Sequence, residues 1–192
     1  MQGVCMSGCD LLDVNSRQDV IAEIFRHRRS VRTYDGTPIQ DAQLKQILEV
    51  GLLAPTGRNL KPVEFIVIQE RDTLRDLAFL RKSGSRMLEQ SGAAILVLAD
   101  TEKTDTWVED AAIAMAYMHL AADALGLGSC WVQMRGRYDV HDNDLDTVLR
   151  QRFGFPKKMQ PLAILALGNT NSHPSAHAES DLSWEKIHKE KY

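Results

Sequence analysis

The sequence predicts one globular domain in which helices and strands form an α/β or α+β sandwich. Its 192 residues, 44% of them hydrophobic and 26% charged, are enough for a domain of moderate size. Helical periods and short apolar runs alternate along the chain without hairpin signals, and helices outnumber strands. Because no linker or repeat divides the chain, we expect a single domain over residues 1–192, with an N-terminal extension at 1–15 and a polar C-terminal tail at 169–192.

Apolar residues at steps of three and four predict the first two helices. One includes residues 20–25 and ends near Arg28, and Ser16 is expected to cap its amino end. The other covers residues 44–52 and stops at the Ala54-Pro55 pair, because the residue before a proline avoids the helical region.

The remaining elements are one long helix, several short helices and four strands. Helix 107–125 is alanine-rich with almost no continuous polar face, which is typical of a helix buried from several sides or lying at a subunit interface. Strand 93–99 is apolar on both faces, as expected for a central strand covered by helices. The other expected elements are strand 64–69, two short helices before residue 93, strand 129–133, helix 142–153 and strand 161–167.

Composition and charge argue against several classes of protein. The longest apolar run, 93–99, is far shorter than the roughly 20 residues that cross a bilayer, and no signal-peptide pattern follows Met1, so we expect a cytoplasmic protein without a membrane partner. A net charge of -3, without aromatic residues among the arginines, argues against nucleic acid. Cys5 and Cys9 lack the further ligands of a zinc site, so we expect reduced thiols and no metal.

The most unusual segment is 26–32 (RHRRSVR), with four arginines in seven residues at the end of the first helix. Arginine binds phosphate bidentately, and Ser30 adds a hydroxyl donor to the same neighbourhood. A solvated basic surface that complements the negative end of the helix dipole explains the run equally well. From the residues alone, a small phosphorylated ligand and a solvated surface both stay open.

Two further segments are weaker signals. In the proline-bounded loop 54–62, Asn59 offers a donor and an acceptor that suit the edge of a planar heterocycle, although a plain turn is the simpler explanation. The glycines of segment 126–134 follow a helix and precede a strand, the reverse of a dinucleotide phosphate loop, and indicate a tight turn. We expect Cys130 to be a buried thiol and His119 a satisfied core or interface residue.

No paired carboxylates, metal-ligand spacing or Ser-His-Asp order stands out in the chain. We therefore expect no catalytic side chain, and a bound cofactor that supplies the reactivity.

Several segments together resemble the FMN-dependent nitroreductase family. The combination of an arginine-serine-arginine block with an Ala-Pro loop roughly 25 residues later is specific, whereas either half alone is not. The segments that carry the resemblance are 28–35 (RRSVRTYD), 39–53, 54–62 (APTGRNLKP), 64–68, 110–133 and 163–168.

The resemblance implies an α+β three-layer sandwich with a central mixed sheet flanked by helices. It also implies a homodimer joined through long helices, with FMN held at the interface by both subunits. Arg28 and Ser30 would contact the FMN phosphate and ribityl chain, with Arg29 beside them.

Around the flavin ring, the resemblance implies a further set of contacts. Arg32 would approach the pyrimidine side, where a fixed cation stabilises the negative charge that reduction brings. Asn59 would bond the polar edge of the flavin, and backbone amides around Gln133 and Met134 would lie near N5 and O4. Many members have an acidic residue followed by glycine at these last two positions, so contacts near N5 are expected to differ.

The C-terminal region departs from the family pattern. The usual Lys/Arg pair that completes the phosphate site after the last strand is absent from residues 168–177, and His177 or Ser175 is the expected substitute. Segment 184–192 resembles the ending of a shorter-chain subgroup and is expected to pack across the partner subunit.

The expected function is an FMN-dependent oxidoreductase with a ping-pong mechanism. NADH or NADPH would reduce the flavin and leave, and an electron-poor acceptor such as a nitroaromatic or quinone would take its place. Alternatives are a flavin enzyme of the same fold that dehalogenates its substrate or fragments flavin, a flavin-binding or redox-sensing protein with slow turnover, and a basic-patch interaction module without flavin.

Overall fold

The computed structural model describes residues 14–192. Most of the expected extension at 1–15, with Cys5 and Cys9, lies outside the described residues. Over the described part of the chain, every helix is too short or too polar to cross a membrane.

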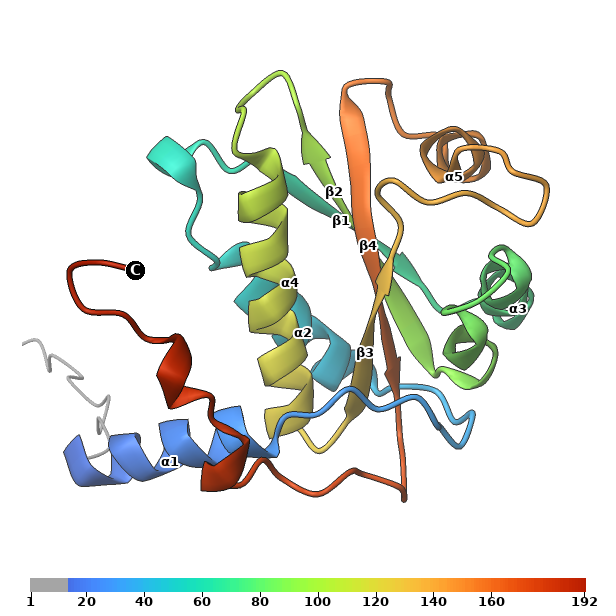
Figure 1. Ribbon diagram of the computed structural model, residues 1–192. Helices are drawn as coiled ribbons and strands as arrows, with labels where there is room; N and C mark the ends of the chain where they lie inside the picture. Colours follow the sequence, from blue (N-terminus) through green and yellow to red (C-terminus); the bar gives the residue numbers. More distant parts are fainter. Residues whose placement is uncertain (1–13) are drawn as a thin grey trace, which may run out of the picture.

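A four-stranded sheet in the order β1-β2-β4-β3 forms the middle layer (Figure 1). The strands are β1 (Val63–Ile68), β2 (Ala93–Asp100), β3 (Gly128–Gln133) and β4 (Met159–Gly168). Every ladder is antiparallel. β4 inserts between β2 and β3, which run in the same direction. Among residues 14–192, the expected mixed character of the sheet is confined to one isolated parallel bridge between Ser30 and Ser129.

Helices cover both faces of this sheet. The helices of the described chain are α1 (Val14–His27), α2 (Asp41–Leu52), α3 (Arg71–Phe79), α4 (Trp107–Ala124) and α5 (Leu145–Phe153), of which α1 packs against α4. α2 and α4 lie on one face, and α3 and α5 lie on the other (Figure 1). A hydrophobic core lies on each face of the sheet, and alternate residues of β2 pack into the two cores. Leu96 lies in one core and Ile95 in the other, and both are fully buried. The predicted α+β sandwich with an apolar central strand is confirmed.

The long helix α4 packs on the sheet and against α2, as its near-apolar sequence predicts. Ile113 and Tyr117 of α4, one turn apart, are 38% and 40% exposed, so one stripe of this helix faces outward.

Two predicted helix starts are wrong. α1 begins by Val14, so Ser16 lies inside the helix rather than at its cap, since serine costs little in a helix interior and no Gly or Pro interrupts this stretch. α5 begins at Leu145 instead of residue 142. Asp139 accepts hydrogen bonds from the amides of His141 and Asn143 and holds this stretch as a turn until the helix starts.

The glycines around β3 bring the chain after α1 close to the sheet. Gly126 turns the chain with a φ of 75°, as the tight turn requires. At Gly128 a Cβ atom would lie 2.7 Å from Cγ1 of Val31, so only glycine allows this approach. The Val31 amide then donates to the Ser129 carbonyl at 2.9 Å, which fixes residues 28–31 alongside β3.

Candidate functional site

Arg28 and Ser30 line one open cavity of about 400 Å³ at the carboxyl end of α1. Trp131 of β3 and His119 of α4 line it too, together with Phe25, Ala116 and Leu120. The volume falls in the range of roughly 300–1,000 Å³ that is usual for ligand pockets. A guanidinium, a hydroxyl and an indole on one surface suit a ligand that carries both an anionic group and a flat ring.

His119 is buried beside this cavity and forms hydrogen bonds with Arg28 and Ser129. Its Nε2 lies 3.3 Å from Nη1 of Arg28, and its Nδ1 is hydrogen-bonded to Oγ of Ser129. Burial, and then the positive charge of Arg28, lower the pKa of His119 to about 4, although the Asp123 carboxylate opposes this shift. Because a guanidinium only donates, Nε2 accepts from Arg28 and the Nδ1 hydrogen goes to Ser129. The expectation of a satisfied core residue is confirmed, and its partners are now defined.

The arginine block divides between the cavity and the C-terminal tail. Arg29 donates to the Ser175 carbonyl, while the Arg26 carbonyl accepts the His177 amide at 2.8 Å and its guanidinium pairs with Glu179. The His177 ring bonds Asp181 at 3.4 Å and lines a second cavity with Phe25 and Leu182. Arg29, Ser175 and His177 therefore take part in holding the tail, and none of the three lines the cavity of Arg28 and Ser30.

Arg32 is exposed, and its Nη1 donates to the Ser30 carbonyl at 3.4 Å. Its charge also reaches Cys130, where it opposes the effect of burial, but burial prevails and raises the pKa of the thiol. The prediction that Cys130 is a buried thiol is confirmed.

Asn59 lies far from Arg28 in this chain. It ends the short turn Gly57–Asn59, which is held at the amino end of α4 because Asp110 accepts the Gly57 amide at 2.8 Å. Asp110 precedes His119 by nine residues, which is about 13 Å of helix axis. The turn Gly57–Asn59 and the carboxyl end of α1, which Arg28 follows, thus lie near opposite ends of α4 (Figure 1).

Gln133 and Met134 lie where β3 ends. The Gln133 side chain accepts a hydrogen bond from Nε1 of Trp131 at 2.8 Å and so steadies the indole that walls the cavity. The Met134 amide donates to the Leu162 carbonyl at 3.1 Å, and its side chain is buried in the core. That amide is engaged within the fold.

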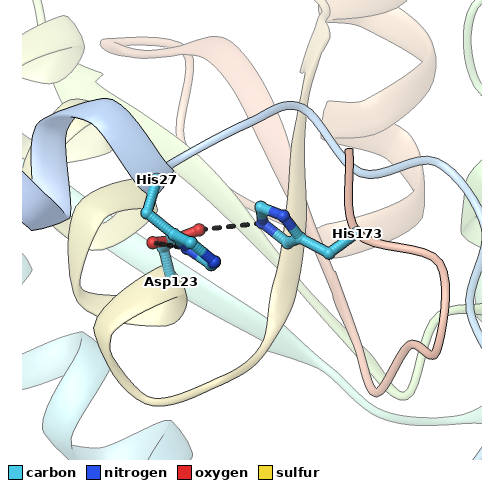
Figure 2. Close-up of side chains that lie close together, drawn as sticks. All are labelled: His27, Asp123 and His173. Carbon is cyan, nitrogen blue, oxygen red and sulfur yellow. Dashed lines mark hydrogen bonds and ion pairs between the residues drawn. The ribbon is translucent and has the colours of Figure 1, made fainter. Parts of the chain in front are cut away.

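A second polar cluster, which sequence analysis missed, joins three distant segments (Figure 2). Asp123 of α4, with a side chain only 5% exposed, bonds His27 of α1 at 2.8 Å and His173 of the tail at 3.1 Å. The two rings are stacked, with centroids 4.3 Å apart and planes 15° from parallel. A metal ion binds an imidazole in the plane of its ring, and two stacked planes only 15° from parallel meet far from both rings. The stacked cluster therefore suits two hydrogen bonds to one carboxylate, which clasp the tail to α1 and α4. Asp123 follows His119 by one turn on a helix that is otherwise apolar. This pair of polar residues is the sequence pattern that could have indicated the cluster.

Residues 25–90 and 80–169 match the model of the nitroreductase family. A protein of Archaeoglobus fulgidus, provisionally named as an NADH dehydrogenase/NAD(P)H nitroreductase, is 31% identical over 170 residues, which cover 86% of this chain and 94% of that protein. The chain belongs to the nitroreductase family. The resemblance inferred from the sequence is confirmed.

Solved structures of nitroreductases share this fold. An FMN-dependent nitroreductase from Clostridium difficile has a TM-score of 0.85 and 36% identity, with 89% of this chain and 99% of that chain covered. A structure from Desulfovibrio desulfuricans, provisionally named a nitroreductase and in complex with FMN, has a TM-score of 0.71 and 25% identity, with 90% and 97% covered.

Proposed function

We propose that this nitroreductase-family protein is an FMN-dependent oxidoreductase that carries electrons from NADH or NADPH to an electron-poor acceptor such as a nitroaromatic or a quinone, by a ping-pong mechanism. The family membership supports the proposal, as do the relatives whose names mention FMN and NAD(P)H. The observation that carries it is the shared cavity of Arg28 and Ser30, walled by the Trp131 indole.

The donor set of the cavity fits the phosphate of FMN. α1 points its negative carboxyl end toward this region, so an anion here depends on cationic side chains rather than on the helix dipole. Arg28 offers a guanidinium whose neighbour, His119, is neutral at pH 7 because its pKa is about 4. The positive charge of Arg28 is thus left for the ligand, and the Ser30 hydroxyl adds a second donor.

FMN, when bound, supplies the two-electron chemistry that links NAD(P)H to the acceptor. In this proposal Arg28 and Ser30 hold the phosphate end, and Arg32 presents positive charge on the pyrimidine side. Trp131 and Gln133 shape the wall beside the ring. No side chain needs to act as a general acid, since the open cavity admits water as the source of protons.

We further propose that two copies of the chain complete the site. Asn59, expected at the polar edge of the flavin, lies at the far end of α4 from Arg28, so the partner subunit must supply it. Exposed apolar side chains surround its turn and continue onto the outward stripe of α4, as a subunit interface requires. These side chains are Leu52, Leu53, Leu60, Ile113 and Tyr117.

The absorbance spectrum of the purified protein tests the function. We expect a yellow protein whose flavin absorbance is bleached by NADH or NADPH and restored by a quinone or nitroaromatic. Steady oxidation of NAD(P)H that accelerates with a quinone separates this enzyme from a flavin-binding sensor with slow turnover. A colourless protein that fails to take up FMN would refute the proposal.

A further inference from the structure

We propose that His119, anchored by Ser129, positions the Arg28 guanidinium for the phosphate group of FMN. The proposal rests on the function proposed above and adds two residues to it, neither of which needs to touch the flavin.

Two hydrogen bonds in series connect the Arg28 side chain to the sheet, and a third connects the nearby backbone of Val31. Ser129 is a buried residue of β3, and its carbonyl accepts the Val31 amide at 2.9 Å. Its hydroxyl accepts from Nδ1 of His119, whose Nε2 accepts from Arg28 at 3.3 Å. Ser129 therefore fixes the backbone that follows Arg28 and, through His119, also fixes the guanidinium. Because a free arginine side chain has several rotatable bonds, this support spares the ligand the cost of ordering it.

The chemical identity of the group that accepts the Arg28 hydrogen bond matters as much as its position. A neutral imidazole orients Arg28 without cancelling its charge, whereas a carboxylate in the same place would compete with phosphate for it. The Asp123 carboxylate lies one turn further along α4, close enough for its charge to act on His119. Its two oxygens are engaged by His27 and His173 (Figure 2). His119 thus lies between Arg28 and the nearby Asp123 carboxylate, and both oxygens of that carboxylate are already bound by His27 and His173.

Flavin titrations of the FMN-free protein test this role, with fluorescence quenching as the readout. His119→Leu removes both hydrogen bonds of the ring, whereas His119→Gln keeps a carbonyl acceptor near the position of Nε2. FMN and riboflavin differ by the phosphate, so the ratio of their dissociation constants isolates the contact with that group. We expect His119→Leu to raise the dissociation constant of FMN about tenfold and to leave that of riboflavin unchanged, with most of the loss recovered by His119→Gln.

Two further variants complete the experiment. Ser129→Ala removes the anchor but leaves the His119 ring, and we expect the same selective loss in smaller degree. Met118→Leu changes the neighbouring buried residue of α4 at nearly constant volume, and both dissociation constants should stay at the wild-type value. If His119→Leu does not fold, Ser129→Ala and His119→Gln provide the comparison.

The outcomes separate the two proposals. Equal losses of FMN and riboflavin affinity in His119→Leu or Ser129→Ala mean a general packing role, and unchanged FMN affinity means no role, so either result overturns the positioning proposal. A wild-type protein that binds neither flavin overturns the proposed function itself.

Discussion

Arg28 differs from the other arginines of its block in what it faces. Arg26 pairs with a carboxylate and Arg29 donates to a tail carbonyl, so both serve the fold. Arg28 meets a neutral imidazole at the edge of an open cavity and keeps its charge available. Four arginines that look alike in the sequence thus have different tasks, and the local side-chain environment decides which one can bind an anion.

Replacement of Arg28 by alanine should weaken FMN binding. Loss of one charge-assisted contact with phosphate costs about 1.5–3 kcal/mol, which equilibrium titration of the FMN-free protein measures. Arg26→Ala is the matched control, because Arg26 is bound to the exposed Glu179 on the tail and should leave FMN affinity unchanged. Equal affinities in Arg28→Ala and the wild type would remove Arg28 from the site.

His119 should make folding stability depend on pH. Its pKa is about 4 in the fold, under the influence of burial, Arg28 and Asp123, and 6.5 in the unfolded chain. The unfolded chain therefore takes up the proton first as the pH falls. Stability is fully present above pH 6.5 and is lost between pH 6.5 and 4, by roughly 3 kcal/mol in total.

Urea unfolding of the wild type and His119→Gln at pH 7.5 and pH 4.5 measures this contribution. The wild type should lose more stability than the variant between the two values, since glutamine does not titrate. Identical losses in the two proteins would mean that folding does not lower the pKa of His119.

Strand β3 and the chain after α1 pack together as one unit. Gly128→Ala should overpack this unit, because its Cβ would lie 2.7 Å from buried Val31. We expect a loss of about 1–3 kcal/mol in the free energy of unfolding measured with urea, and weaker FMN binding, because Ser30 moves with Val31.

Gly126→Ala is the control. Its Cβ meets no atom within 4 Å, so it carries only the left-handed backbone penalty of about 1 kcal/mol and should leave FMN affinity unchanged. Full stability and full affinity in Gly128→Ala would contradict the close approach.

The elements most fully predicted from sequence are those whose signal is periodic and local. Helix 44–52 and strand 93–99 follow directly from apolar spacing, because each is defined by the face or faces it buries. The start of α5 could not be predicted in the same way. It depends on which amides the Asp139 carboxylate captures, and a polar side chain near a helix end can serve either a turn or a cap.

Contacts between distant segments bring the candidate site together. Arg28 and Ser30 are close in sequence, so their common place at one cavity could be predicted from one short block together with the family resemblance. The contact of Arg28 with His119 spans 91 positions, and the contact of His173 with Asp123 joins the tail to α4. Neither contact can be predicted from the spacing of residues within one segment, because each joins residues that are far apart in the chain. His119 was therefore expected only as a satisfied core residue, and the cluster was missed.

Mixing two defective variants tests whether the site spans two chains. Arg28→Ala and Asn59→Ala should each reduce NAD(P)H oxidation. In a two-fold symmetric dimer of one variant with the other, one of the two sites regains both residues, and random mixing should restore about a quarter of the wild-type sites. Activity that stays at the sum of the separate variants, in a mixture shown to have exchanged subunits, would confine the site to one chain.

A crystal structure of the protein with FMN would locate the cofactor relative to Arg28. We expect the FMN phosphate within hydrogen-bond distance of Arg28 and Ser30, the His119 imidazole against the Arg28 guanidinium, and Asn59 of the partner subunit at the edge of the flavin ring. FMN bound away from the Arg28 cavity, or held there by a single chain without Asn59 of a second copy, would contradict this expectation.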